Sequence, residues 1–210
     1  MKLQDLRRRV LAVAQEAYRL KLMTMTSGNF SARDPETGLI AITPSGRSYT
    51  TMTEADIVLV DRDAKVVDGA HKPSSETPLH VGIYRAKGDV FGISHVHSAH
   101  ANAVGVLGVT VPPLVGTMWR YIGGDLRTAP HKESGTFEYA DHIMGVMKEC
   151  RAAIMANHGL IAVGPTVEKA LESTAYAEEG AQIYLLSRGL GEPSRHPRPE
   201  PGSMYAPDWW

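Results

Sequence analysis

Cysteine is almost absent from this 210-residue sequence, so no disulfide can form within the chain. The single cysteine, Cys150, fits a reducing compartment and is expected to be a small buried hydrophobe rather than a nucleophile. Long apolar runs are also missing, because none approaches the roughly 20 residues that a membrane-spanning helix needs. The charged N-terminal stretch MKLQDLRRRV does not look like a targeting segment. The sequence therefore predicts a cytoplasmic protein without a membrane partner.

An excess of charge of one sign is missing as well. Lys and Arg total 22, Asp and Glu total 23, and the formal net charge is −1, so nucleic acid is not an expected partner. The phosphate-binding patterns GxxxxGK[ST] and GxGxxG do not occur, and neither does the serine-hydrolase pattern GxSxG. Nucleotide binding of either familiar kind and serine-hydrolase chemistry are therefore not supported.

What the chain does contain is typical of one globular domain. The hydrophobic content of 43% and the charged content of 21% are near globular averages, and neither an internal repeat nor a linker is visible. The domain is expected over residues 1–189, followed by a Pro-rich tail, 190–210, without lasting regular structure. Trp209 and Trp210 in this tail are apolar enough to need a surface on the same or a neighbouring subunit.

Apolar periodicity predicts the main elements. Helices are expected over 3–20, from Thr77 as N-cap with Pro78 in the first turn, and over 99–107, 137–147 and 166–187, the last with Thr166 as N-cap. Strands are expected over 39–43, 57–61, 65–67, 91–97, 153–156 and 160–163. SGNFSAR at 27–33 is interpreted as a tight turn, and 108–135 as an irregular segment that lines a site or an interface.

Two histidines in FGISHVHS give the first indication of chemistry. Side chains two apart on a strand share a face, so His95 and His97 present two imidazoles side by side. Imidazole nitrogen suits Zn²⁺, although a chain with nine histidines also produces His-x-His by chance. His158, in a turn between two apolar runs, is a candidate third ligand or a solvated turn residue. Glu76 is a candidate fourth ligand, a general base or an ordinary surface charge.

Three loops have the composition of an anion cradle, with hydroxyl groups and accessible backbone N–H groups. Each loop alone is only a turn. They contain Ser27-Gly28-Asn29, Pro44-Ser45-Gly46 and Pro73-Ser74-Ser75.

Five motifs, SGNFSAR, ITPSG, KPSSE, HVH and NHGLIAVG, follow one another over positions 27–164. Together they resemble the class II aldolase family, which includes L-fuculose-1-phosphate aldolase, L-ribulose-5-phosphate 4-epimerase and the adducin head domain. The resemblance implies a single α/β domain of three layers, with a mostly antiparallel central β-sheet flanked by helices. It also implies a homotetramer with sites at subunit interfaces. The tail lies outside the resemblance and is expected to dock on its own or a neighbouring subunit.

The resemblance also implies the site residues. It makes His95, His97 and His158 the ligands of one Zn²⁺ per subunit, with another divalent metal as an alternative, and it places Glu76 at the metal as an acidic ligand and base. It assigns the substrate phosphate to Gly28, Asn29, Ser45, Gly46, Ser74 and Ser75. These are the same residues that the strand, turn and loop patterns indicate.

The implied activity is reversible aldol cleavage of a sugar phosphate. A ketose 1-phosphate of the fuculose, rhamnulose, 5-deoxyribulose or 5-methylthioribulose type would give dihydroxyacetone phosphate and an aldehyde through a zinc-stabilised enediolate. Glu76 favours an aldolase, since epimerase relatives typically carry aspartate there, although SSETPLH looks epimerase-like. Adducin-like binding modules lack the metal histidines, all three of which occur here. A related dehydratase or decarboxylase activity is a further alternative.

The acid that acts on the aldehyde oxygen is less defined, because PPLVGTMWRYIGG does not align cleanly with the family. Tyr121 is the nearest candidate, and Tyr205 of a neighbouring subunit's tail is a second. Either tyrosine also reads as a core or interface aromatic. The apolar Met118 and Trp119 favour a deoxy or thioether aldehyde.

Overall fold

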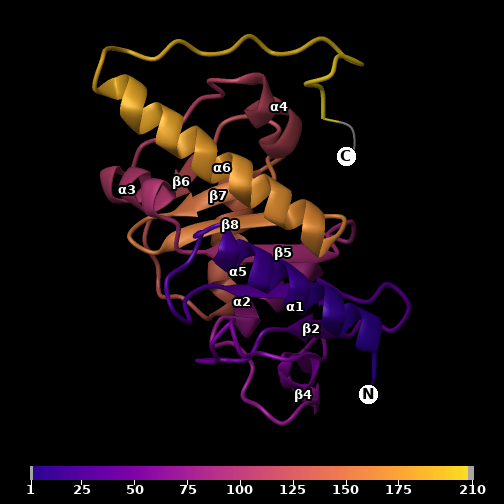
Figure 1. Ribbon diagram of the computed structural model, residues 1–210. Helices are drawn as coiled ribbons and strands as arrows, with labels where there is room; N and C mark the ends of the chain where they lie inside the picture. Colours follow the sequence, from indigo (N-terminus) through magenta and orange to yellow (C-terminus); the bar gives the residue numbers. More distant parts are fainter. Residues whose placement is uncertain (1, 208–210) are drawn as a thin grey trace.

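The structure, a computed structural model, describes residues 2–207 and is built on one eight-stranded sheet (Figure 1). The strand order is β4-β3-β2-β1-β5-β8-β7-β6, and every neighbouring pair is antiparallel except β6 and β7. The predicted mostly antiparallel sheet is therefore confirmed. The strands are β1 (Asn29–Arg33), β2 (Ile40–Ile42), β3 (Val58–Val60), β4 (Val66–Asp68), β5 (Gly92–Val96), β6 (Arg127–Ala129), β7 (Ala152–Met155) and β8 (Gly159–Gly164).

Six α-helices and a short 3-10 helix occur in the described part of the chain. They are α1 (Gln4–Arg19), η1 (Glu54–Asp56), α2 (Thr77–Ala86), α3 (Ala99–Leu107), α4 (Gly116–Ile122), α5 (Phe137–Met147) and α6 (Val167–Arg188). Helices α1, α3 and α4 all pack against α6, whereas α2 packs against α5 (Figure 1).

Side-chain contacts of β1 show that the helices cover both faces of the sheet. Phe30 packs edge-on against Tyr49, which in turn contacts Tyr18 of α1. The next residue, Ser31, hydrogen-bonds His80 of α2 at 2.7 Å. Because adjacent strand residues point to opposite faces, α1 and α2 lie on opposite sides of the sheet. These three layers agree with the predicted architecture.

The helix boundaries follow the predicted signals with one exception. The Thr166 side chain accepts a hydrogen bond from the Lys169 N–H at 3.2 Å and caps α6, as predicted. The predicted N-cap of α2 is wrong, because Thr77 is already helical and Glu76 is the N-cap. The Thr77 hydroxyl instead donates to the Ser74 carbonyl at 2.6 Å, while Pro78 lies in the first turn as expected.

The turn predicted for SGNFSAR is wrong beyond Gly28, since Asn29–Arg33 form β1 at the centre of the sheet. Asn29 and Ser31 are buried polar residues on the face that carries α2, where their side chains bond to Glu76 and His80. Polar residues on both sides of Phe30 suggest a solvent-exposed segment. Only helix α2 supplies the partners that allow them to be buried.

The segment 108–135 is more regular than predicted, because it contains α4 and β6. The tail beyond α6 has no helix or strand up to residue 207, as expected, and it folds back over α4 of the same chain. The Arg195 guanidinium pairs with Asp125 at 2.7 Å, and the Trp119 indole N–H donates to the His196 carbonyl at 3.3 Å. Trp209 and Trp210 lie outside the described residues.

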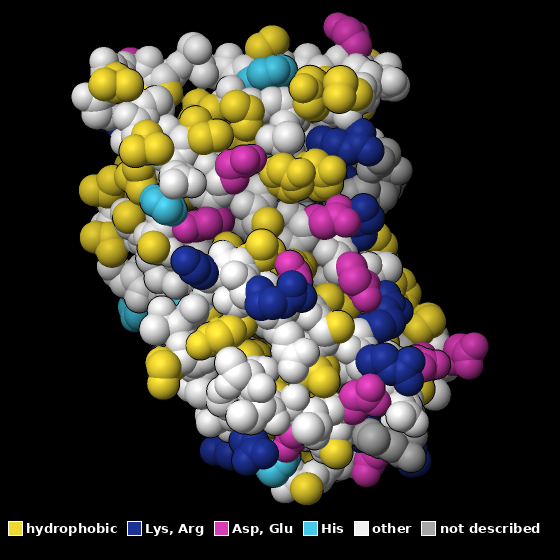
Figure 2. All heavy atoms as spheres, in the orientation of Figure 1, with side chains coloured by type: hydrophobic (Ala, Val, Ile, Leu, Met, Phe, Trp, Pro, Cys, Tyr) yellow, Lys and Arg dark blue, Asp and Glu magenta, His cyan; other side chains and the backbone are white. Residues whose placement is uncertain are grey.

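Charges of both signs are interspersed over α1 and α6, as Figure 2 shows. Arg9 pairs with Glu168 at 2.7 Å and Arg8 with Glu54 at 3.1 Å. This mixed surface matches the balanced composition. Among the described helices, none is both long and apolar enough to cross a membrane. Cys150 is buried, as predicted.

Gly92→Ala is expected to lower the free energy of unfolding by about 3 kcal/mol, the upper end of the usual cost of overpacking. A Cβ at Gly92 would lie 2.2 Å from the Thr166 carbonyl carbon and 2.2 Å from the Val167 nitrogen, and neither backbone atom can rotate away. Urea unfolding measures the effect. The control is Gly145→Ala within α5, where the added Cβ meets nothing within 4 Å and where alanine favours the helix. Equal stability of the two variants would contradict the predicted clash.

Candidate active site

His95 and His97 converge on the α2 face of the sheet, as their spacing predicts. His95 pairs with Asn29 of β1, and His97 follows directly after the last residue of β5. Their ring centroids lie 4.9 Å apart. His95 is fully buried, so the first imidazole is fixed by the sheet and the second lies at the open end of the strand.

His158 completes a group of three imidazoles. It lies in the turn between β7 and β8, where Asn157 has a positive φ of 55°. Its ring centroid is 4.9 Å from that of His95 and 5.2 Å from that of His97. One ring nitrogen from each histidine lies within 4.8 Å of the others. The structure therefore brings the three predicted metal ligands together.

Gly159 is required for this convergence. A Cβ at this position would lie 2.5 Å from the Val96 carbonyl oxygen and 2.8 Å from Cε1 of His95. The His95 ring therefore occupies the space that a side chain at position 159 would need. This explains why glycine follows His158 in the turn.

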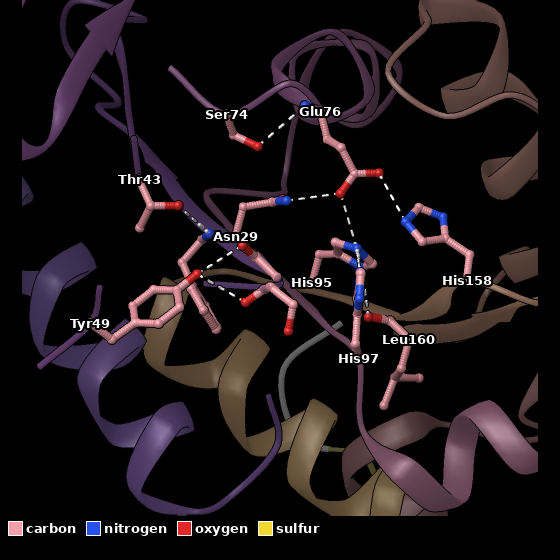
Figure 3. Close-up of polar contacts among 12 residues, drawn as sticks. Asn29, Thr43, Tyr49, Ser74, Glu76, His95, His97, His158 and Leu160 are labelled. Atoms are coloured by element: carbon pink, nitrogen blue, oxygen red, sulfur yellow. Dashed lines mark hydrogen bonds and ion pairs between the residues drawn. The ribbon is translucent and has the colours of Figure 1, made fainter. Parts of the chain in front are cut away.

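Glu76 points into the histidine group from the N-cap position of α2 (Figure 3). Its Oε2 lies 3.0 Å from Nε2 of His95, and its Oε1 lies 3.3 Å from Nε2 of His158. The Asn29 side-chain amide donates to Oε2 at 2.8 Å. This carboxylate is 6% exposed, which removes the interpretation of Glu76 as an ordinary surface charge.

The three rings present nitrogen atoms that suit a cation. Nδ1 of His95 donates to the Leu160 carbonyl at 3.0 Å, so its Nε2 faces His97 and Glu76. Burial and the neighbouring His95 lower the pKa of both His97 and His158 to about 4. Neutral imidazoles and a carboxylate oxygen that converge in this way fit a divalent metal ion.

Glu76 itself remains ionised. Burial raises its pKa, but the adjacent His95 and the hydrogen bond from Asn29 outweigh burial and hold the pKa of this carboxyl well below its usual range. The site therefore contains one buried negative charge beside the imidazoles. A cation bound among them would compensate this charge.

Without bound metal, the protein is expected to lose stability as the pH falls from about 6.5 to about 4. In this window the unfolded chain binds protons on histidines of ordinary pKa, 6.5, whereas His97 and His158 of the folded chain stay neutral down to about pH 4. Unfolding therefore takes up protons and becomes easier in acid. Urea unfolding of chelator-treated protein at pH 7 and pH 5 measures the loss. A double variant, His97→Asn with His158→Asn, should show a smaller loss, and an equal loss would contradict the prediction.

The three predicted phosphate loops lie side by side. Pro44 and Pro73 form an isolated bridge, and the Ser45 N–H donates to the Lys72 carbonyl at 3.0 Å. The Phe30 N–H donates to the Thr43 hydroxyl at 3.1 Å, which joins the residues flanking the first two loops (Figure 3).

Two of these loops also reach Glu76 and its helix. The Ser74 hydroxyl accepts from the Glu76 N–H at 3.2 Å, next to the N-terminus of α2. Ser45, Gly46 and Ser75 are exposed, whereas the Asn29 amide is committed to Glu76 rather than open to a ligand. The structure thus groups these residues beside the histidines.

Tyr121 and Tyr205 are not brought to the histidines of their own chain. Tyr121 stacks on Tyr176 of α6, with ring centroids 4.0 Å apart, and Tyr205 packs against Gly116 of α4. The argument from Met118 and Trp119 is wrong for the same reason. Met118 is buried against Gly180 of α6 and Trp119 lies beneath the tail, because α4 packs on α6 rather than on the site.

Sequence reasoning missed one residue at the site, Tyr139 of α5. Its ring lies nearly parallel to that of His158, with an interplanar angle of 14° and centroids 6.3 Å apart. No motif marks this residue. An aromatic side chain at helical spacing is usually core, and only the packing of α5 against α2 reveals its neighbours.

Comparison with known proteins gives consistent results. Residues 8–185 match the family described as Class II Aldolase and Adducin N-terminal domain. The chain is 35% identical over 200 residues to the 5-deoxy-D-ribulose 1-phosphate aldolase of Bacillus thuringiensis serovar kurstaki, covering 95% of this chain and 93% of that protein. It is 34% identical over 199 residues to an L-ribulose-5-phosphate 4-epimerase of Salmonella paratyphi C, covering 90% and 87%. A solved L-fuculose 1-phosphate aldolase superposes with a TM-score of 0.87 at 32% identity, covering 92% and 91%.

Proposed function

Because this chain belongs to the class II aldolase and adducin N-terminal domain family, we propose that it cleaves a (deoxy)ketose 1-phosphate reversibly into dihydroxyacetone phosphate and an aldehyde. The family membership indicated by the five sequence motifs is confirmed. The observation that carries the proposal is the convergence of Glu76 and three imidazoles beside three hydroxyl-rich loops.

The proposed metal is Zn²⁺, held by His95, His97 and His158. A divalent ion there supplies the positive charge that stabilises negative charge on the substrate oxygens. The His95 ring keeps the right tautomer for this role through its hydrogen bond to the Leu160 carbonyl. The choice of zinc over another divalent metal is part of the proposal.

Glu76 is the proposed general base. In the synthetic direction it takes a proton from the carbon next to the carbonyl group of dihydroxyacetone phosphate, and in the cleavage direction it returns that proton. The Asn29 amide holds Oε2 at 2.8 Å, which orients the carboxylate towards the histidines. Ionisation of the buried Glu76 keeps the base ready to accept the proton.

The substrate phosphate is proposed to bind the loops that contain Gly28, Ser45, Gly46, Ser74 and Ser75. Backbone N–H groups, serine hydroxyls and the N-terminus of α2 offer donors there. Gly46 has a positive φ of 68°, which glycine adopts without strain. A Cβ built at Gly46 would meet nothing within 4 Å, so the space beside this loop is open to a ligand. Asn29 follows Gly28 in the first of these loops, and its side-chain amide is proposed to hold Glu76.

The acid for the aldehyde oxygen is proposed to come from a second subunit. Tyr121 and Tyr205 lie on or against α4, away from the histidines of their own chain, so either would act only across a subunit interface. We therefore keep the homotetramer with interfacial sites as a proposal. A cytoplasmic location and the assignment of 1–189 and 190–210 as domain and tail are also proposals.

A specific observation supports an epimerase as the second candidate, namely the 34% identity to an L-ribulose-5-phosphate 4-epimerase. The experiment that separates the two measures dihydroxyacetone phosphate release from 5-deoxyribulose, fuculose, rhamnulose and 5-methylthioribulose 1-phosphates, with Zn²⁺ and with chelator. Epimerisation of L-ribulose 5-phosphate is measured alongside. Metal-dependent release is expected. The 5-deoxyribulose compound is expected to be the preferred substrate, because the aldolase relative of Bacillus thuringiensis is named for it. Epimerisation without release would establish the second candidate instead.

A further inference from the structure

Tyr139 has a buried hydroxyl group that no hydrogen bond explains. The residue is 1% exposed, and among the described residues its hydroxyl oxygen has no hydrogen-bond partner. A buried donor without a partner costs stability, so native structures rarely keep one without a reason. Packing alone would be served equally well by phenylalanine.

The surroundings of this hydroxyl indicate what it serves. The Tyr139 ring is stacked on His158, whose Nε2 lies 3.3 Å from Oε1 of Glu76. That same Oε1 is buried and accepts no hydrogen bond within the described chain, whereas Oε2 is held by Asn29. An unpartnered donor and an unpartnered acceptor therefore belong to two residues that both neighbour the His158 ring.

The chemistry of a phenol agrees with a donor role. Its ordinary pKa is about 10, so it keeps its proton at neutral pH. Tyr139 can therefore donate a hydrogen bond to a carboxylate.

We propose that the Tyr139 hydroxyl is the hydrogen-bond donor that receives the Glu76 carboxylate when Oε1 turns away from His158. Glu76 occupies the centre of the histidine group in this structure and must leave part of it to a metal ion and a substrate carbon. Tyr139 then fixes the base in its working orientation and acts as a positioning residue. This inference rests on the proposed function, because it assigns a partner to the proposed base.

The test is Tyr139→Phe, for which stability and activity should move in opposite directions. Removal of an unpartnered buried hydroxyl should leave the melting temperature of the chelator-treated protein unchanged or raise it. The same change should slow the exchange of the dihydroxyacetone phosphate C3 proton with deuterated water by roughly tenfold or more, with an unchanged KM. A hydroxyl with only a structural role would not produce this pair of results.

The matched control is Tyr84→Phe, another buried tyrosine of the same layer. Its hydroxyl lies 2.9 Å from the Ser31 hydroxyl, so its removal should lower the melting temperature and leave the exchange rate unchanged. Exchange in Tyr139→Phe within about twofold of the wild type would overturn the inference, as would a drop in melting temperature. Absence of exchange and of aldol cleavage in the zinc-loaded wild type would instead overturn the proposed function, and the inference with it.

Discussion

Glu76→Gln is expected to keep stoichiometric Zn²⁺ and to lose at least roughly 10²-fold in turnover. Glutamine has the shape of glutamate and can still meet the Asn29 amide and the histidines, but its amide does not accept the substrate proton. The three imidazoles, which supply the neutral nitrogen ligands, are unaffected by the change. The measurements are the metal content of the purified variant and the rate of dihydroxyacetone phosphate release.

The control for this experiment is Glu172→Gln on the exposed side of α6. Glu172 pairs with Lys169 at 2.8 Å on the surface, so this variant should turn over normally. Near-normal turnover of Glu76→Gln itself would remove Glu76 from the role of base. A loss of both metal and turnover would show that Glu76 acts as a ligand first.

His97→Ala is expected to lose both bound metal and turnover. Two imidazoles would remain, and the position of the lost ring would be open to water. Loss of an outer contact to a ligand typically costs 10 to 100-fold in metal affinity, so loss of a ligand itself should cost at least about 10²-fold. Metal analysis after dialysis and turnover at saturating substrate measure the two effects.

His100→Ala is the matched control for that variant. His100 lies three residues further along the chain, but its ring pairs with Glu178 of α6 at 2.8 Å rather than with the histidine group. This variant should keep its metal and its turnover. Retention of metal by His97→Ala would contradict the assignment of His97 as a ligand.

Local rules predicted much of this fold. The apolar stripe of α1, the N-cap Thr166 and the alternation in β5 depend on neighbours a few residues away, and each reached the structure with nearly the expected boundaries. Two errors share a cause. Asn29 and Ser31 look like turn residues, and α4 has no clear stripe, because their partners come from α2 and α6.

The sequence by itself determined that His95 and His97 share a face, because strand geometry repeats every two residues. It also determined the family, because five motifs follow one another over positions 27–164, within the residues 8–185 that match the family. Tertiary structure alone decided that His158 and Glu76 meet those rings, that Tyr139 stacks on His158, and that Tyr121 and Tyr205 lie elsewhere. The physical reason is that such contacts join residues distant in the chain. Helix packing and strand order bring them together, and neither is encoded in the spacing of a local motif.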